Sequence, residues 1–206
     1  HLRDGYIRTT FDWSIDQNHT MKNDVTIFMN RSQKHNGNIK YTLSPNYTGR
    51  IVLNYSINAQ DLNFFDSNEK VEIYLEEIDK GFDLDQRLVW LETKTNNNLS
   101  IATAATIVIE SASKPKYKLE FNQEDLLANV ELTLDVKKDI EYNVYILGSI
   151  YTSKDSEYPI KDAKENCLEN KDLGWLNLFK ANKKKWNSIW STDLIITGKN
   201  TTEIQK

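Results

Sequence analysis

Four acidic side chains lie close enough in the sequence to suggest acid–base chemistry. They form two pairs, Glu76 with Glu77 and Asp83 with Asp85. Two carboxyl groups can act as general acid and general base where an apolar surrounding raises the pKa of one of them. The residues around both pairs are polar and typical of loops. We therefore expect these four acids to lie on a solvated surface rather than in a catalytic site.

Patterns for metal binding and nucleophilic catalysis are equally weak. Asp83-Leu84-Asp85 lacks the glycine and the closing glutamate of a calcium-binding loop. Cys167 is the single cysteine, which excludes an internal disulfide and a thiolate zinc site. A catalytic thiol needs a histidine partner, and His1, His19 and His35 lie in or beside polar, turn-like sequence. The sequence therefore predicts no catalytic residue, no metal site and no cofactor site in this chain.

Aromatic residues near the C-terminus follow the spacing of a helix. The stripe consists of Trp175, Phe179, Trp186 and Trp190. Residues three to four apart share one face of a helix, so we expect a helix from Leu173 to Trp190 with Lys183 to Lys185 turned outward. Tryptophan faces can also stack on sugar rings, but at core spacing tryptophan is more often a packing residue. We expect Trp186 and Trp190 to clamp this helix to the rest of the fold.

Composition suits one globular domain. The chain has 206 residues, of which 39% are hydrophobic and 11% aromatic, enough for a core. The net charge is only -4, and acidic and basic residues are interspersed along the chain. The sequence therefore lacks the basic patch that is typical of nucleic-acid-binding proteins. No apolar run approaches the length needed to insert into a membrane.

Runs of β-branched and aromatic residues predict nine or ten strands before the first helix. The runs are Tyr6 to Trp13, Val25 to Met29, Ile39 to Leu43, Ile51 to Ile57, Val71 to Leu75, Leu88 to Thr95, Ile101 to Ile109, Tyr117 to Phe121, Val130 to Val136 and Tyr142 to Tyr151. The first four are too close for crossover helices, so we expect consecutive antiparallel strands in a meander or a Greek key, with a turn at Asn36-Gly37-Asn38. Ile101 to Ile109 is free of charge and rich in small residues, which indicates a central strand covered on both faces. The spacing predicts a two-layer sandwich or a barrel.

The pattern becomes helical after Pro159. We expect a β-sandwich over residues 1–157 and a helical linker over residues 158–206. The linker comprises a helical piece from Ile160 to Asn170, a break near Gly174, the striped helix, and a short strand from Asp193 to Thr197. Because a new helix start at Thr201 is followed by only one turn, we expect these residues to be a piece of a longer protein.

Two stretches resemble glycoside hydrolase family 65. The stretch from Leu2 to Trp13 resembles the opening of that family's N-terminal domain, in which "Leu-Asp-x-Arg-x-Gly" leads into an aromatic strand, here with Arg3 and Gly5 in place and the first acid missing. The region around Arg31-Ser32 is a loose counterpart of the family's "Arg-x-x-Ser". The more specific match is Trp186-Asn187-Ser188-Ile189-Trp190 followed by Asp193-Leu194-Ile195-Ile196-Thr197-Gly198-Lys199. It is similar to the family's "Trp-x-x-x-Trp" and "Asp-Ile-x-Ile-x-Gly-Asp" passage, with Lys199 in place of the last acid.

The resemblance implies a mainly β fold, the large antiparallel super-sandwich of galactose mutarotase type, with C-terminal linker helices leading to an (α/α)6 catalytic barrel. Family members hydrolyse or phosphorolyse α-glucosides such as trehalose, maltose, kojibiose and nigerose with inversion. Their general acid and phosphate-binding loop lie in the barrel, and no position here matches them. The implied partners are the barrel of the same chain, an oligosaccharide substrate at the domain interface, and a second copy in a homodimer.

The alternative is a free-standing carbohydrate-binding or adhesive sandwich with no enzyme attached. The terminal helix discriminates between the two interpretations, because a free-standing module has no use for a linker. Six Asn-x-Ser/Thr triplets occur in a chain rich in asparagine. We expect a bacterial source without glycans, and favour the periplasm over the cytoplasm.

Overall fold

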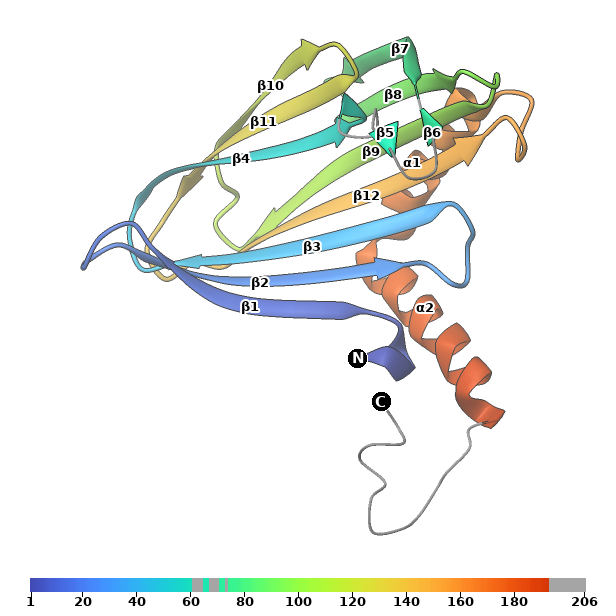
Figure 1. Ribbon diagram of the computed structural model, residues 1–206. Coiled ribbons are helices and arrows are strands. Elements are labelled where there is room, and N and C mark those ends of the chain that lie inside the picture. Colours follow the sequence, from blue (N-terminus) through green and yellow to red (C-terminus); the bar gives the residue numbers. More distant parts are fainter. Residues whose placement is uncertain (61–64, 67–70, 73, 193–206) are drawn as a thin grey trace.

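A computed structural model describes residues 1–60, 65–66, 71–72 and 74–192 (Figure 1). The chain starts with a 3-10 turn, η1 (Leu2–Asp4), and continues into twelve strands among the described residues. The strands are β1 (Ile7–Ser14), β2 (Thr20–Met29), β3 (Asn36–Pro45), β4 (Gly49–Asn58), β5 (Phe65–Asp66), β6 (Val71–Glu72), β7 (Leu75–Asp83), β8 (Leu88–Thr95), β9 (Ser100–Ser111), β10 (Tyr117–Glu124), β11 (Leu127–Val136) and β12 (Tyr142–Thr152). Helices α1 (Pro159–Leu173) and α2 (Trp175–Ile189) and a 3-10 turn, η3 (Trp190–Thr192), follow.

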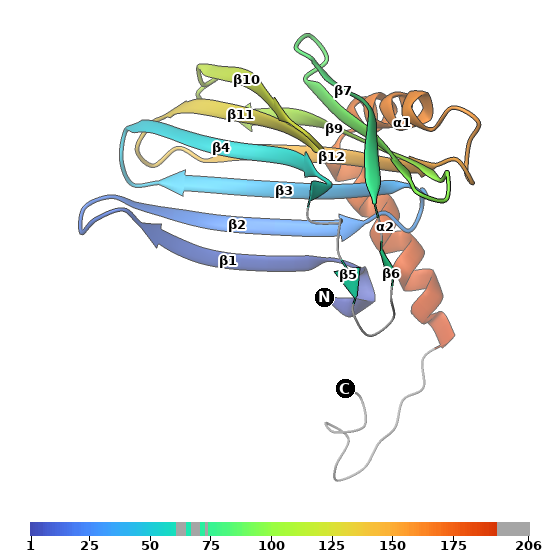
Figure 2. The same ribbon diagram turned by 45° about the horizontal axis from the view of Figure 1, so that its top comes forward.

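The strands form two antiparallel layers, which confirms the predicted mainly β sandwich with C-terminal helices. The large sheet has seven strands in the order β1-β2-β3-β12-β9-β8-β7, and the small sheet has three in the order β10-β11-β4. In Figure 2, β1, β2 and β3 lie side by side at one end of the large sheet. β5 and β6 form a separate pair.

The fourth strand does not continue the meander formed by the first three. β1, β2 and β3 form the expected antiparallel meander, but β4 leaves the large sheet and pairs with β11. The next neighbour of β3 is β12, from the far end of the chain. Alternation of apolar and polar residues indicates a strand with one apolar face. It does not determine which sheet the strand joins, because that face could be buried in either sheet.

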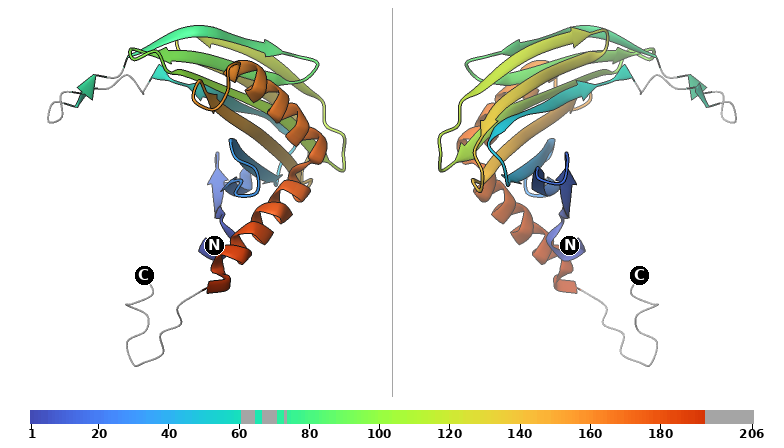
Figure 3. Two further views of the ribbon diagram at one scale, coloured as in Figure 1. Left: turned by 90° about the vertical axis from the view of Figure 1, so that its right-hand side faces the viewer. Right: turned by 90° about the vertical axis from the view of Figure 1, so that its left-hand side faces the viewer.

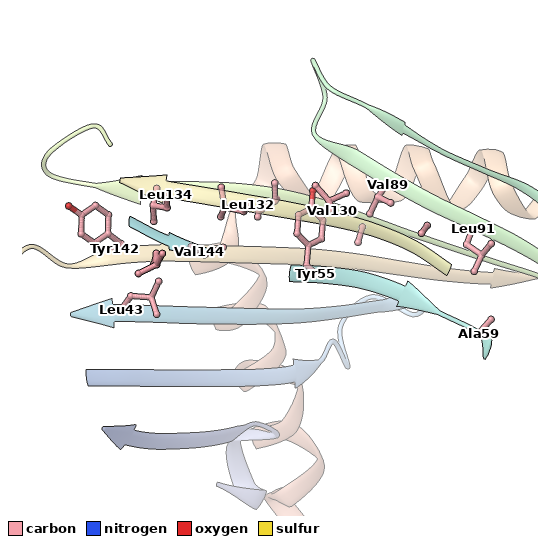
Figure 4. Packing of buried hydrophobic residues seen from close by; sticks show 14 of the residues in the cluster. Leu43, Tyr55, Ala59, Val89, Leu91, Val130, Leu132, Leu134, Tyr142 and Val144 are labelled. Atoms are coloured by element: carbon pink, nitrogen blue, oxygen red, sulfur yellow. The ribbon is translucent and has the colours of Figure 1, made fainter. Parts of the chain in front are cut away.

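The core lies between the two sheets (Figure 4). β11 alternates strictly, with every second residue from Ala128 to Val136 buried against the large sheet. This confirms the predicted strand with one solvated face. The facing residues include Leu43 on β3, Tyr55 on β4, and Val89 and Leu91 on β8.

Helix α1 covers the other face of the large sheet, which we call the outer face (Figure 3). Ala102 and Ala104 on β9 are fully buried against Ala163 and Cys167 of α1. Ala105 and Ile107, on the inner face of the same strand, belong to the inter-sheet core. β9 is therefore central and covered on both faces as predicted, because its small side chains let the helix approach closely.

Two local predictions on the strands are wrong. Asn36 begins β3 instead of forming a turn, and the reversal occurs over the preceding residues, where His35 adopts a φ of 68°. Asn36 and Asn38 are buried, and Asn36 donates its side-chain N–H to the carbonyl of Gly148 at 3.0 Å. β7 includes Glu76 and Glu77, which the sequence placed in a loop, because this charged segment forms an edge strand along β8.

The two helices follow the predicted order with a break at Gly174. This glycine has a φ of 75°, a conformation that glycine tolerates best, and it donates its N–H to the carbonyl of Asn170. The predicted strand from Asp193 to Thr197 and the helix start at Thr201 lie outside the described residues. Within the described ranges, neither helix has the length and apolar character needed to cross a membrane.

Candidate functional site

Helix α2 is the candidate functional element, since it carries the aromatic stripe and extends beyond the edge of the sheet at β1 (Figure 1). Its first half packs on the outer face of the large sheet. Trp175 meets Phe28 of β2 edge to face at 5.0 Å between ring centroids, and Phe179 lies 5.5 Å from the same ring. Leu178, which the predicted stripe did not include, is only 2% exposed within this cluster.

The second half of α2 packs against the N-terminal turn instead of against a strand. Trp186 lies directly over Gly5, and a Cβ built on Gly5 would stand 1.9 Å from the Trp186 Nε1 atom. Trp190 stacks on Trp186 with ring centroids 6.5 Å apart. Both indole N–H groups are buried, and neither has a hydrogen-bond partner among the described residues. The two tryptophans therefore join the distal end of α2 to the start of the chain.

Asn182 connects α2 to two distant segments through three hydrogen bonds. Its Oδ1 accepts the backbone N–H of Arg31 at 2.8 Å. Its Nδ2 donates to the backbone carbonyls of Asp4 at 3.3 Å and Gly5 at 3.2 Å. The side chain is fully buried. Because a buried amide needs hydrogen-bond partners and finds them in the backbone of these two segments, Asn182 fixes the position of α2 relative to both η1 and the turn after β2.

Lys183 also faces the N-terminal turn, which contradicts the expectation that Lys183 to Lys185 all point outward. Its Nζ lies 3.2 Å from Asp4 Oδ2 and 5.9 Å from the centroid of the Tyr6 ring. Lys184 and Lys185 are exposed as predicted. The long aliphatic stem lets a lysine cover an aromatic surface while its ammonium group pairs at the rim.

Lys183→Gln should lower the free energy of unfolding by about 0.5–1 kcal/mol, the range for a partly exposed ion pair with an aromatic contact. Lys184→Gln, one residue along the same helix, should leave it unchanged. Urea unfolding at low and high salt would measure both, and the Lys183 effect should shrink as salt rises. Equal effects of the two substitutions would show that the Asp4 contact does not hold the helix.

The acidic pairs singled out in the sequence are used in structural contacts. Glu77 Oε2 accepts the backbone N–H of Leu126 at 2.9 Å and pairs with Lys80 at 2.7 Å. Asp83 Oδ1 accepts the N–H of Gln86 at 2.9 Å in the turn that follows β7. Glu76 and Asp85 are exposed. Each pair thus has one carboxyl group held in a structural contact and one on the solvated surface, as expected.

The remaining candidates do not form a reactive cluster. Burial raises the pKa of the Cys167 thiol to about 12, and its Sγ donates to the carbonyl of Ala104 at 3.1 Å. His19 pairs with Asp16 in a turn, and His35 stacks on Tyr151. Among the described residues no group of three or more histidine, cysteine or acidic side chains is placed to hold a metal ion.

The other two tryptophans lie in different settings. The ring of Trp90 is covered by Lys164, whose Nζ lies 3.4 Å from its centroid, and its Nε1 donates to Asp79 at 2.9 Å. Trp13 on β1 is 52% exposed. The face of Trp90 is thus occupied by protein, whereas Trp13 is open.

Leu178 and Asn182 were missed at the sequence level, and Gly5 was noted only as part of a family-like segment, without its contact to Trp186. Helical spacing places position 182 on the buried face of the predicted helix. It does not indicate that the amide of Asn182 forms hydrogen bonds there. A left-handed glycine beneath an indole has no local signature, because the two residues lie at opposite ends of the chain.

Comparisons with known proteins agree with this architecture. The family described as "Glycosyl hydrolase family 65, N-terminal domain" matches residues 1–189. No protein with a curated description matches. Among solved structures, one described as a "Putative kojibiose phosphorylase from human microbiome" superposes with a TM-score of 0.75 at 14% sequence identity. The alignment covers 92% of this chain and 24% of that one, so the chain spans about a quarter of that protein's length.

Proposed function

The chain belongs to glycosyl hydrolase family 65, as an N-terminal domain, and from this premise we propose that it is a non-catalytic support for a catalytic barrel in the same polypeptide. The observation that carries the proposal is helix α2. It is anchored at the sheet by Trp175 and Phe179 and at the N-terminal turn by Asn182, while its far end extends past β1 (Figure 1). A helix fixed at several points can hold a following domain in a set orientation.

The distal end of α2 offers groups that a neighbouring domain could use. The buried N–H groups of Trp186 and Trp190 have no partner in the described part of the chain. Buried donors are normally satisfied, so we propose that the adjoining part of the polypeptide supplies acceptors. The free-standing module is not favoured, because the family match includes both helices.

We propose that the whole protein phosphorolyses an α-glucosidic disaccharide with inversion. Support comes from the family and from the name of the similar solved structure, a putative kojibiose phosphorylase. Inverting cleavage requires a protonated carboxylic acid on one side of the bond and an attacking phosphate or water on the other. Both groups would come from the barrel, while the loops of this domain would help to shape the substrate entrance.

The test is an assay of the full-length protein on kojibiose, trehalose, maltose and nigerose, with and without phosphate. We expect glucose 1-phosphate from one of them, with release that depends on phosphate. Glucose release without phosphate would show a hydrolase instead. Failure to cleave any α-glucoside would favour the carbohydrate-binding alternative.

The non-catalytic role predicts that acidic residues of this domain can be replaced without loss of chemistry. In the full-length protein, Glu76→Gln, Glu77→Gln and Asp85→Asn should each keep kcat within about twofold, because none would contribute to the transition state. Glu77→Ala should lower stability by about 1–2 kcal/mol, since the N–H of Leu126 loses its acceptor. A loss of about 100-fold in kcat with unchanged stability would place that carboxyl group in the active site.

A homodimer remains a prediction, which light scattering of the full-length protein over a range of concentrations would test.

A further inference from the structure

A row of five isoleucines crosses the inner face of the large sheet. Successive strand pairings place them directly opposite one another, in the order Ile7, Ile27, Ile39, Ile146 and Ile107. At one end Ile107 is only 1% exposed beneath the small sheet. At the other end Ile27 is 39% and Ile7 67% exposed. The same apolar row therefore runs from the core into solvent.

The row becomes exposed because the small sheet is too narrow to cover the large one. β4 and β11 lie over β8 and β9, and the small sheet ends at β4 (Figure 4). The inner faces of β1 and β2 carry further exposed apolar side chains, namely Phe11, Trp13 and Met29. No described residue covers this inner surface of β1, β2 and β3, which we call the open floor. A continuous apolar surface of this kind usually marks an interaction site.

Among the described residues β4 has a strand on one side only, and its other edge lacks the features that normally block strand addition. Its sequence contains neither lysine nor proline, and Arg50 is its one charged residue. By contrast, the edge strand β7 carries five charged residues and a register shift between Glu77 and Asp79, and β10 carries Lys118, Glu120 and Glu124. Charges and bulges protect sheet edges from pairing, so β4 is a template for another strand where β7 and β10 are not.

A groove marks the place where an added strand would begin. It has a volume of about 260 Å³ and lies between β4 and the floor, lined by Ile39, Tyr41, Tyr55 and Ile146 among others. Apart from one asparagine, the lining residues are aliphatic residues and tyrosines, so the groove suits an apolar side chain of an added strand.

We propose that the open floor and the β4 edge bind β-strands from the part of the same polypeptide that lies outside residues 1–206. Strands pack about 4.8 Å apart, and four steps separate β9 from β1 in the large sheet, so about four further strands would extend the small sheet from β4 to a position over β1. The similar solved protein is about four times as long as the segment it shares with this chain, which leaves ample polypeptide for the purpose. The inference rests on the proposed function in one respect, namely that the polypeptide continues beyond this domain.

Two adjacent threonines on β1 provide a matched pair for the test. Thr9 lies opposite Val25 on the inner face, and Thr10 lies opposite Asp24 on the outer face. Both are exposed, while the native Cys167 is buried. In the full-length protein, Thr9→Cys should react with a maleimide at least about 30-fold more slowly than Thr10→Cys, because docked strands exclude the reagent from the inner face. Peptide mass spectrometry would separate these sites from other cysteines.

Hydrogen exchange over residues 49–58 provides the second readout. Amides along both sides of β4 should exchange slowly in the full-length protein, because strand pairing protects the free edge. Equal labelling of the two cysteines, or fast exchange on one side of β4, would overturn the inference. Protection that appears only at high protein concentration would identify a second copy as the occupant and would also overturn it.

The outcome is independent of the activity assay. A protein that cleaves its disaccharide normally while Thr9→Cys labels as fast as Thr10→Cys would refute strand docking and leave the proposed function intact. A protected inner face in a protein without activity would support strand docking and refute the proposed reaction.

Discussion

Gly5→Ala should lower the free energy of unfolding by about 3 kcal/mol, from a left-handed backbone cost of about 1–2 kcal/mol and a displaced indole. Gly5 has a φ of 65°, and the new methyl group would stand 1.9 Å from Trp186 Nε1. The indole ring is rigid and stacked on Trp190, so it cannot move aside without losing that contact. Chemical unfolding monitored by circular dichroism would measure the loss.

Gly174→Ala separates the two causes. Gly174 has a φ of 75°, and nothing lies within 4 Å of its added Cβ. Its ψ of 152° places it in a backbone region that is populated almost only by glycine, so it should show a backbone cost of about 1–3 kcal/mol without any steric clash. In a double-mutant cycle, Trp186→Ala should remove most of the extra cost at Gly5, which would appear as a coupling of about 1–2 kcal/mol. Additive effects would show that the indole does not lie over the glycine in solution.

Strands were predictable from the pattern of their own side chains. β11 alternates apolar and polar residues over its whole length, which indicated one buried and one solvated face. The small residues of β9 correctly indicated a strand covered on both faces. Pairing was not predictable in the same way. β4 joins β11 because of long-range packing, which an alternation of apolar residues cannot specify.

The wrong secondary-structure predictions concerned polar residues that the structure places in strands. β7 contains five charged side chains, which lowered its strand propensity, yet an edge strand tolerates charge because one side remains solvated. The Asn36-Gly37-Asn38 segment has strong turn propensity, but Asn36 binds the carbonyl of Gly148 on β12. Tertiary hydrogen bonds thus outweighed the local preference.

The α2 site was predictable as a helix face but not as a set of contacts. Spacing identified the aromatic stripe, and Trp175 and Phe179 do meet Phe28. The sequence could not show that Asn182 and Lys183 face a turn near residue 5, because nothing local reports a partner about 180 residues away. The polar half of the site therefore emerged only from the structure.

Asn182→Asp should lower the free energy of unfolding by about 3 kcal/mol or more at pH 7, the range for an unsatisfied charge in a buried network. One carboxylate oxygen can still accept the N–H of Arg31. The other would face the carbonyl oxygens of Asp4 and Gly5, which the amide Nδ2 now contacts at 3.3 and 3.2 Å. Three acceptors would then meet without a proton between them.

The pH dependence of this variant identifies the mechanism. Repulsion from two carbonyls and burial both raise the pKa of the new carboxyl group in the folded state above its unfolded value of about 3.9. The protonated acid can donate to one carbonyl, so the variant should approach wild-type stability below that unfolded pKa and lose stability as pH rises through the folded pKa. Asn177→Asp loses a bond to the carbonyl of Leu173 at an exposed position of the same helix, where water can replace it, so its effect should be far smaller and nearly independent of pH. Unfolding curves for both variants and wild type from pH 3.5 to 7.5 would measure this. A stability difference between Asn182→Asp and wild type that stays constant with pH would mean that the amide does not bind these carbonyls.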